Sequence, residues 1–583
     1  MNFKDYFRSK KDNIIEEKVE MYPITNDSFL DVHHHYDKND FIFEWKELLD
    51  SNRELWNKSL EKTSDDKKVL MITLGGGFSH RHIMNIDNLL NIALTLRGAK
   101  VETFICDHAL PVCLKAEYAY IKPEVIHHSQ ISQTLCKGCY KDSAAVSLQL
   151  GLTTHMLSSY VTLEQRQQAR ELSQTIPVAE IKGYHINGVN VGKHATSGTI
   201  RYFSHSEPTQ ITLGEETLRR YFEASIITYH ALIKILTENK YESVCLTHGV
   251  YMPHGVIKDI CEHLKIPVVC WVVTCLKNRF IFSRGETLYS MLHEPNSSWE
   301  NIKWGTSQEK VIMDYLNSRW GNTKDWLPIP KENIKISFKD FANEKKIDLN
   351  KPIVGLLTNI IWEAYAEYNS RIFPDMLTWL QKTISYFAKR KDLQLLIRIH
   401  PAEQMWNISR QPALIEINKM FPKLPSNIFI IESNTNVSTY EAMQHCDSVI
   451  IYQTQTGIEL TAMDGIPVVV AGDAWIRNKD IAHEPSSEEE YFSCLNQMPF
   501  KSRLSDEKIQ RARKYAYHAF YRKMIPLTFF EETKDWLLFK SKIKKLDELM
   551  PNVHKGLDII CDGLMNGTPF IYPDEEHTQE ETT

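Results

Sequence analysis

Residues 448–472 read SVIIYQTQTGIELTAMDGIPVVVAG, and this stretch decides the fold class. An apolar, β-branched run is followed by a polar turn, a helix-length segment and a second apolar run. Two strands connected through a helix pair in parallel, so the stretch predicts a βαβ unit. Upstream, PIVGLLTNI at 352–360 and LQLLIRIH at 393–400 predict two more strands around an amphipathic helix at 373–390. We therefore predict an open α/β domain in this half of the chain.

The same alternation occurs in the first half. KKVLMITLGGG at 67–77 predicts a strand that ends in three glycines, and YESVCLTHG at 241–249 predicts another strand before a helix. The chain has 583 residues, more than a single hydrophobic core usually organises. The sequence thus predicts a GT-B-like α/β architecture, in which two Rossmann-like doubly wound domains face a central cleft. The expected segments are a helical N-terminal extension (1–65), an N-terminal Rossmann-like domain (66–335) with a Cys-containing insertion (106–150), a C-terminal Rossmann-like domain (350–505), and C-terminal helices with a disordered acidic tail (506–583).

Composition narrows the functional class. Hydrophobic residues make up 43% of the chain and charged residues 24%, which is typical of a soluble globular protein. A net charge of −6 argues against a general nucleic-acid-binding protein. The start MNFKDYFRSKKDN lacks the apolar core of a signal peptide, and no apolar run approaches the roughly 20 residues that cross a bilayer. We therefore expect a cytoplasmic protein.

The predicted strand at 393–400 ends with unusual chemistry. Arg398 and His400 lie two residues apart, so they share one face of the strand, and Pro401 stops the ladder. An arginine offers a fork of donors, and a histidine donates a hydrogen bond or a proton near neutral pH. The pair suits a phosphate or a carboxylate. The structural alternative is a histidine bonded to a neighbouring carbonyl and an arginine in a surface ion pair.

The turn QTQTG follows the strand at 448–453 in the same manner. Gln455 and Thr456 supply polar side chains, and Gly457 allows close approach of the backbone as a helix begins. Free amides at that helix start favour an anion, and Glu459 in the first turn can accept hydrogen bonds from sugar hydroxyls. The structural alternative makes Thr456 an N-cap and Glu459 its capping-box partner.

These motifs resemble a known family. RIHPAE, together with SVIIYQTQTGIELTAMDGIPVVVAGDAWIRNKD, resembles the C-terminal half of bacterial capsule and surface-polysaccharide biosynthesis proteins, which are GT-B glycosyltransferases that include transferases of 3-deoxy-octulosonic acid (Kdo). The matching elements are His400-Pro401, the Thr-Gly-x-Glu helix start at 456–459 and the Gly-Ile-Pro-Val strand at 465–468. The resemblance implies that His400 contacts the donor phosphate and that Glu459 holds the ribose. It also implies association with membrane-bound capsule machinery at the inner face of the membrane.

Residues on the acceptor side should come from the first half. His248 directly follows the predicted strand SVCLT and is our candidate for the catalytic base, although a structural histidine is the competing interpretation. The loop TLGGGFSHRH does not match a dinucleotide fingerprint. GVNVGKHATSGTIRYF at 188–203 predicts a Gly/Ser/Thr loop that binds an anionic acceptor, or only a surface turn and a helix start. The predicted acceptor-side residues are Gly76, Gly77, His80, Lys193 and Arg201.

Four of the eleven cysteines fall in one window: Cys106, Cys113, Cys136 and Cys139. A C-x-x-C pair with two further thiols predicts a structural site for tetrahedral zinc or for an iron–sulfur cluster. The upstream spacing is irregular for a zinc ribbon, and four unrelated thiols are the alternative.

Together these features predict a metal-independent glycosyltransferase, because no Asp-x-Asp ends a strand. Its expected partners are a nucleotide-sugar donor, with CMP-Kdo or a related CMP-ulosonic acid preferred, and a polysaccharide or glycolipid acceptor. The predicted donor-binding residues are Arg398, Gln455, Thr456, Gly457 and Glu459, with His400 and His248 as catalytic residues. No cofactor is expected for catalysis. The alternatives are a CDP-glycerol-type phosphotransferase, a nucleotide-sugar epimerase, and a non-catalytic nucleotide-sugar-binding partner of a capsule assembly complex.

Overall fold

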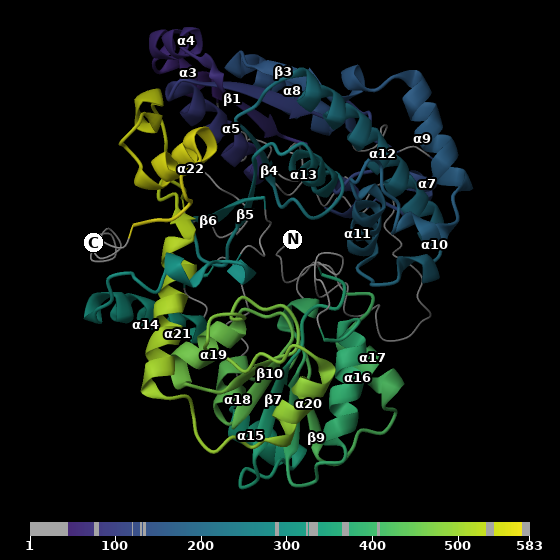
Figure 1. Cartoon of the computed structure of the whole chain (residues 1–583), viewed down its shortest axis with the longest axis vertical. Coiled ribbons are helices and arrows are strands. Elements are labelled where there is room, and N and C mark those ends of the chain that lie inside the picture. Colours follow the sequence, from purple (N-terminus) through teal and green to yellow (C-terminus); the bar gives the residue numbers. More distant parts are fainter. Residues whose placement is uncertain are drawn as a thin grey trace.

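The computed structural model describes residues 45–74, 81–118, 121–128, 131, 136–285, 291–321, 324–325, 336–363, 372–404, 409–531 and 541–573. Two α/β units lie one above the other in Figure 1, and each is built on a largely parallel sheet. The predicted fold class, two Rossmann-like doubly wound units, is confirmed.

The first sheet has the order β12-β6-β5-β4-β1-β2-β3. Its strands are β1 (Ser64–Ile72), β2 (Ala99–Ile105), β3 (Thr153–Met156), β4 (Ser243–Thr247), β5 (Val268–Val273), β6 (Arg279–Arg284) and β12 (Met524–Pro526). The strands from β3 through β2, β1 and β4 to β5 pair in parallel, whereas β6 pairs antiparallel with both of its neighbours. In order of appearance the parallel strands are arranged 3-2-1-4-5, which places the topological switch point between β1 and β4.

Helices cover both faces of this sheet. They are α3 (Trp45–Asp50), α4 (Arg53–Glu61), α5 (Arg81–Leu96), α6 (Lys115–Tyr118), α7 (Pro123–His127), α8 (Lys137–Leu150), α9 (Leu163–Thr175), α10 (Val178–Ile181), α11 (Val191–Phe203), α12 (Gly214–Glu238), α13 (His254–His263) and α22 (Lys555–Asn566). Alternate residues of β1 enter opposite cores, Leu70 and Ile72 in one and Val69 and Met71 in the other. This alternation follows from the two-residue period of a strand, and burial on both faces explains why β1 ends as a continuous apolar run.

The second sheet is parallel throughout, with the order β11-β10-β7-β8-β9. Its strands are β7 (Ile353–Leu357), β8 (Gln394–Arg398), β9 (Ile428–Ile431), β10 (Ser448–Ile451) and β11 (Val468–Val470). The helices of this unit are α15 (Phe338–Lys345), α16 (Met376–Phe387), α17 (Ala413–Met420), α18 (Thr439–Gln444), α19 (Thr456–Asp464) and α20 (Glu488–Asn496). The strands again follow the 3-2-1-4-5 arrangement, so the switch point lies between β7 and β10.

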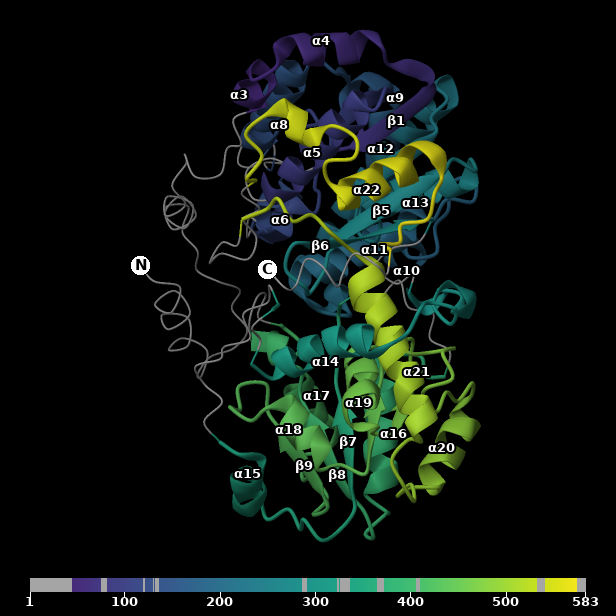
Figure 2. The same cartoon turned by 90° about the vertical axis from the view of Figure 1, so that its left-hand side faces the viewer.

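Two helices connect the units. In Figure 2, α14 (Thr306–Gly321) lies at the top of the lower unit, and α21 (Asp506–Tyr517) runs from beside that unit towards the upper one. The chain continues from α21 through a π-helical turn into β12, which completes the first sheet at its edge. Arg279 Nη1 donates to the carbonyl oxygen of Met524 at 3.0 Å and so fastens this return.

One hydrophobic core extends across the junction. It includes Val272 and Ile281 from the first sheet and Ile458 from α19 of the second unit. The two units are therefore packed together on this side, where α14 and α21 also contribute buried residues.

Parts of the predicted extensions lie outside the described residues, namely 1–44 at the N-terminal end, and 532–540 and 574–583 in the C-terminal segment. Within the described part, no helix combines the length and the apolar character that a membrane span requires.

Candidate active site

The carboxyl end of the second sheet is organised around its switch point. Asn359 follows β7, and its Oδ1 accepts a hydrogen bond of 3.1 Å from the backbone amide of Gln453, which follows β10. The turn after β10 is thereby held beside the turn after β7. In open α/β sheets this is the place where ligands bind, and the predicted donor-binding residues flank it.

The start of α19 has polar, half-buried side chains. Thr454 Oγ1 donates to Thr456 Oγ1 at 3.0 Å and accepts from the Thr456 amide at 3.2 Å. Gln455 is the N-cap residue, but its side chain does not cap the helix. The predicted alternative with Thr456 as the N-cap is therefore wrong, because the helix already begins at Thr456.

Gly457 has a packing role that the sequence did not predict. A Cβ atom at this position would lie 2.6 Å from Cδ1 of Ile451 on β10, inside van der Waals contact. The residue is buried, and its missing side chain lets α19 approach the sheet. Close approach of a ligand to the Gly457 backbone stays a prediction, and helix–strand packing gives a second reason for glycine at this position.

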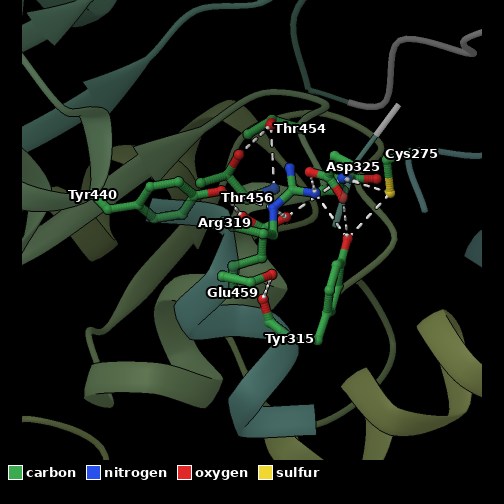
Figure 3. Close-up of polar contacts among 10 residues, drawn as sticks. Cys275, Tyr315, Arg319, Asp325, Tyr440, Thr454, Thr456 and Glu459 are labelled. Atoms are coloured by element: carbon green, nitrogen blue, oxygen red, sulfur yellow. Dashed lines mark hydrogen bonds and ion pairs between the residues drawn. The ribbon is translucent and has the colours of Figure 1, made fainter. Parts of the chain in front are cut away.

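Glu459 lies inside a buried polar network, which is shown in Figure 3. Its Oε1 is 3.2 Å from Nε of Arg319 on α14, and its Oε2 accepts a hydrogen bond from the hydroxyl of Tyr440 on α18. The capping-box alternative for Glu459 is wrong, since its carboxylate points to these side chains. Its contact with a ribose stays a prediction.

Arg319 is the centre of this network. Its Nη1 lies 2.7 Å from Oδ2 of Asp325 and donates to the hydroxyl of Tyr315 at 2.9 Å. Burial acts to lower the pKa of Arg319, but the charge of Glu459 and its neighbours holds that pKa well above the usual value. The side chain therefore remains a cation in a buried setting, where its carboxylate partners offset the cost of desolvation.

The network also joins the two units. Gln455 Nε2 donates to Sγ of Cys275 at 3.7 Å, and Cys275 lies just beyond the end of β5. Since Gln455 lies just beyond the end of β10, the carboxyl ends of the two sheets meet here. Arg319, Tyr440, Asp325 and Tyr315 were missed in the sequence, because none of them directly follows an apolar strand.

His400 follows β8 and is held in one orientation. Its backbone amide donates to Thr358 Oγ1 at 3.0 Å, and its Nδ1 accepts a hydrogen bond of 3.1 Å from the amide of Ala402. Burial and the nearby charge of Arg398 lower the pKa of His400 to about 4. The imidazole is therefore neutral near pH 7 with its hydrogen on Nε2, which has no hydrogen-bond partner among the described residues.

Arg398 is buried and is engaged with the protein. Its Nε donates to Thr439 Oγ1 at 3.1 Å, and its Nη1 donates to the carbonyl oxygen of Glu432. Burial lowers the pKa of Arg398 to about 10. These contacts connect β8 to the start of α18, so the Arg398 side chain holds these two elements together in the protein without a ligand. A direct contact with a donor phosphate stays a prediction.

In the first unit, His248 directly follows β4, as predicted. Its backbone has a φ of +62°, a left-handed conformation that is uncommon outside glycine and often occurs at functional sites. Burial and the charge of Arg201 lower the pKa of His248 to about 3, so the ring is neutral near pH 7. His254 at the start of α13 lies close enough to contribute to the same shift.

The predicted loop around Lys193 and Arg201 is instead the helix α11 (Val191–Phe203), which is buried along most of its length. Gly198 allows this, because a Cβ atom there would lie 2.8 Å from the Tyr221 ring on α12. Arg201 Nε lies 2.7 Å from Glu117 Oε2, and its guanidinium stacks over the Tyr251 ring at 4.5 Å. Gly76, Gly77 and His80 lie outside the described residues.

The four clustered cysteines are near one another. Burial, together with the neighbouring thiols, raises the pKa of Cys106 to about 11 and that of Cys136 to about 12, and it also raises the pKa of Cys113. In the part of the chain that the structure describes, no group of three or more His, Cys, Asp or Glu side chains is arranged to hold a metal ion. The predicted zinc or iron–sulfur site stays a prediction.

Comparison with known proteins found similarity to solved structures only. No family model and no curated protein sequence matches the chain. Among solved structures, KpsC of Thermosulfurimonas dismutans, a beta Kdo 2,4 transferase, aligns at 12% identity with a TM-score of 0.29, over 47% of this chain and 79% of its own. The spinosyn rhamnosyltransferase SpnG aligns at 10% identity with a TM-score of 0.23, over 77% of this chain and 95% of its own. The calicheamicin glycosyltransferase CalG4 aligns at 10% identity with a TM-score of 0.23, over 78% of this chain and 94% of its own. Similarity at this level has no bearing on activity.

Proposed function

We propose that this chain is a glycosyltransferase that moves a sugar from a nucleotide-activated donor to a carbohydrate or glycolipid acceptor. The supporting observation is the meeting of two carboxyl-terminal sheet edges, marked by the contact between Cys275 and Gln455. One edge carries His400 and the start of α19, and the other carries His248. A donor and an acceptor held at these two edges would face each other, as a transfer reaction requires.

The donor phosphates would lie at the start of α19 and at His400. Backbone amides at a helix N-terminus favour an anion, and the neutral His400 ring offers its Nε2 hydrogen. With a pKa of about 4, this ring stabilises the leaving phosphate by a hydrogen bond rather than by transferring a proton. Such a preorganised donor acts most strongly in the transition state, where negative charge builds on the leaving oxygen.

The acceptor hydroxyl would lie near His248. The ring is neutral near pH 7, so one of its two nitrogens has a lone pair that can accept the hydroxyl proton. Its low pKa makes it a weak base, so positioning must supply much of the effect. Arg201 is within electrostatic range both of His248 and of Glu363, which follows β7 in the second unit. The resemblance in the His-Pro and Thr-Gly-x-Glu motifs favours a CMP-ulosonic acid such as CMP-Kdo as the donor and a capsule polysaccharide as the product.

A thermal-shift screen with CMP, CDP, UDP and GDP tests the proposal. A ligand that binds only the native state stabilises it by RT ln(1 + [L]/Kd), or about 2.7 kcal/mol at 100 times Kd. We expect one nucleotide to raise the melting temperature clearly above the others. The matching nucleotide sugar should then release its nucleotide when a suitable acceptor is added. Absence of a shift with every nucleotide contradicts the proposal, and binding without turnover supports a non-catalytic partner.

A further inference from the structure

We propose that Arg319 and Glu459 are positioning residues that orient the Gln455 side chain, so that Gln455 Oε1 accepts a hydrogen bond from the bound nucleotide. This inference rests on the proposed function, because it assigns a role within the same site. It differs from the expected direct contact between Glu459 and the ribose.

Arg319 lies between two matched pairs, each made of a tyrosine and a carboxylate (Figure 3). On one side, Tyr440 accepts from Arg319 Nε at 2.9 Å and donates to Glu459. On the other side, Tyr315 accepts from Arg319 Nη1 at 2.9 Å and donates to Asp325 at 3.1 Å. Each tyrosine hydroxyl both donates and accepts, so the pattern of hydrogen bonds fixes the direction of every group around the guanidinium.

Glu459 is thereby prevented from rotating towards a ligand. Its side chain is fully buried. One carboxylate oxygen forms an ion pair with Arg319, and the other accepts a hydrogen bond from Tyr440. A carboxylate that turned out of this network would leave the Arg319 cation with one carboxylate fewer in a buried setting, which is costly. We infer that Glu459 acts from its buried position and not by contact with substrate.

Gln455 is the group through which Glu459 acts. Gln455 Nε2 donates to Glu459 Oε1 at 3.4 Å and to Cys275 Sγ at 3.7 Å. Only the NH₂ group of an amide can face a carboxylate oxygen favourably, so the chemistry assigns the orientation. The carbonyl oxygen is directed away from Glu459 and has no partner among the described residues, and the side chain is half-buried at the start of α19.

Gln455 Oε1, oriented at the start of α19, can accept a hydrogen bond from a donor group of the ligand. A nucleotide held with its phosphates at α19 offers two sources of such a donor, a ribose hydroxyl and an amino group of the base. A 2′,3′-dideoxy analogue of the nucleotide that binds best separates them. If the ribose is the source, Gln455→Ala weakens binding of the ribonucleotide and not of the dideoxy analogue. If the base is the source, it weakens both.

The experiment measures nucleotide Kd by titration calorimetry on the folded full chain, with the nucleotide that gives the largest thermal shift. Arg319→Lys keeps the charge but loses the forked geometry, and we expect about tenfold weaker binding. Gln455→Ala should have a similar effect. Because both changes remove one hydrogen bond to the nucleotide, the double variant should bind no more weakly than either single variant. Tyr440→Phe serves if Arg319→Lys does not fold, since it removes one hydrogen bond to Glu459 with little change of shape.

Arg513→Lys is the matched control. Arg513 also links α14 to α19, through Glu309 at 2.5 Å and the carbonyl oxygen of Ala462 at 2.9 Å, but at the far end of α19. It should alter the melting temperature and leave Kd within about twofold. Two results overturn this inference alone. One is a double variant whose loss of nucleotide affinity equals the product of the two single losses. The other is wild-type nucleotide affinity in folded Arg319→Lys and Tyr440→Phe. Failure of the wild type to bind any nucleotide overturns the proposed function together with it.

Discussion

Arg319 Nε and Glu459 Oε1 lie 3.2 Å apart and form an ion pair whose side chains are 11% and 0% exposed. Arg319 lies in the last turn of α14 at the junction of the units, and Glu459 lies in the first turn of α19 at the switch point of the second sheet. The pair therefore joins the geometry of the proposed nucleotide site to the packing between the two units.

Removal of one partner of this pair should be costly. Glu459→Ala leaves the Arg319 cation buried with Asp325 as its remaining carboxylate, and we expect a loss of about 3–5 kcal/mol in the free energy of unfolding. Denaturant titration measures this change. Glu54→Ala is the control, because Glu54 pairs with Lys58 at 2.5 Å on an exposed helix, where ion pairs contribute little. Equal and small effects of the two substitutions would show that the buried pair is not important for stability.

His400→Ala should affect turnover more than donor binding. In the proposed reaction the neutral ring would offer its Nε2 hydrogen to the leaving phosphate, so its loss should lower kcat by about 10²–10³ and change the donor KM much less. Steady-state kinetics on the folded variant provide the measurement, with the exposed His185→Ala as the matched control. Wild-type kcat in folded His400→Ala would leave His400 only a structural role at the end of β8.

Protonation of buried histidines should destabilise the protein in mild acid. Burial is the main cause that lowers the pKa of His248 to about 3 and the pKa values of His254, His400 and His518 to about 4. Between these values and the usual 6.5, these four rings bind protons in the unfolded chain but not in the native chain, so their contribution to stability is lost as pH falls through this window. Burial raises the pKa values of Asp87, Glu223 and Glu403, which opposes part of this effect. We expect the four histidines to prevail and the free energy of unfolding to decrease from about pH 6.5 to pH 4.

His254→Asn isolates one contribution to this slope. His254 is 3% exposed, and neither ring nitrogen has a hydrogen-bond partner among the described residues. The substitution should reduce the pH slope of stability by about 1.4 kcal/mol per pH unit within the window. The exposed His185→Asn should leave the slope unchanged. An unaltered slope in His254→Asn would mean that this ring is protonated in the native state.

The four clustered thiols provide a separate test. If Cys106, Cys113, Cys136 and Cys139 are ligands, purified protein should contain about one zinc ion or one iron–sulfur cluster per chain, and a chelator should lower its melting temperature. Cys136→Ser should lose the metal, whereas Cys494→Ser, a buried cysteine of α20, should retain it. Elemental analysis that finds neither zinc nor iron removes this hypothesis.

The sequence predicted the fold class because its strands are apolar on both faces and its helices are amphipathic. The runs at 352–360, 393–400 and 448–453 contain β7, β8 and β10, and His248 and His400 follow strands as expected. Chain-distant additions were not predictable in this way. β12 comes from the predicted tail, and its three residues have no period of their own.

The sequence predicted those residues of the candidate site that come directly after an apolar strand. Arg319 lies within a helix whose sequence alone gives no sign that this arginine turns inward to Glu459. The prediction of a loop around Lys193 was wrong for a different reason. Its glycines indicate a loop in isolation, but Gly198 is required for close packing of α11 on α12. Tertiary packing therefore overrides local propensity in that segment.

A crystal structure of the chain with its preferred nucleotide bound is the decisive measurement for the proposed site. We expect a phosphate oxygen within about 2.7–3.2 Å of His400 Nε2, near the first amides of α19, and a ligand donor on Gln455 Oε1. A nucleotide bound elsewhere, with His400 and the start of α19 unoccupied, would contradict it.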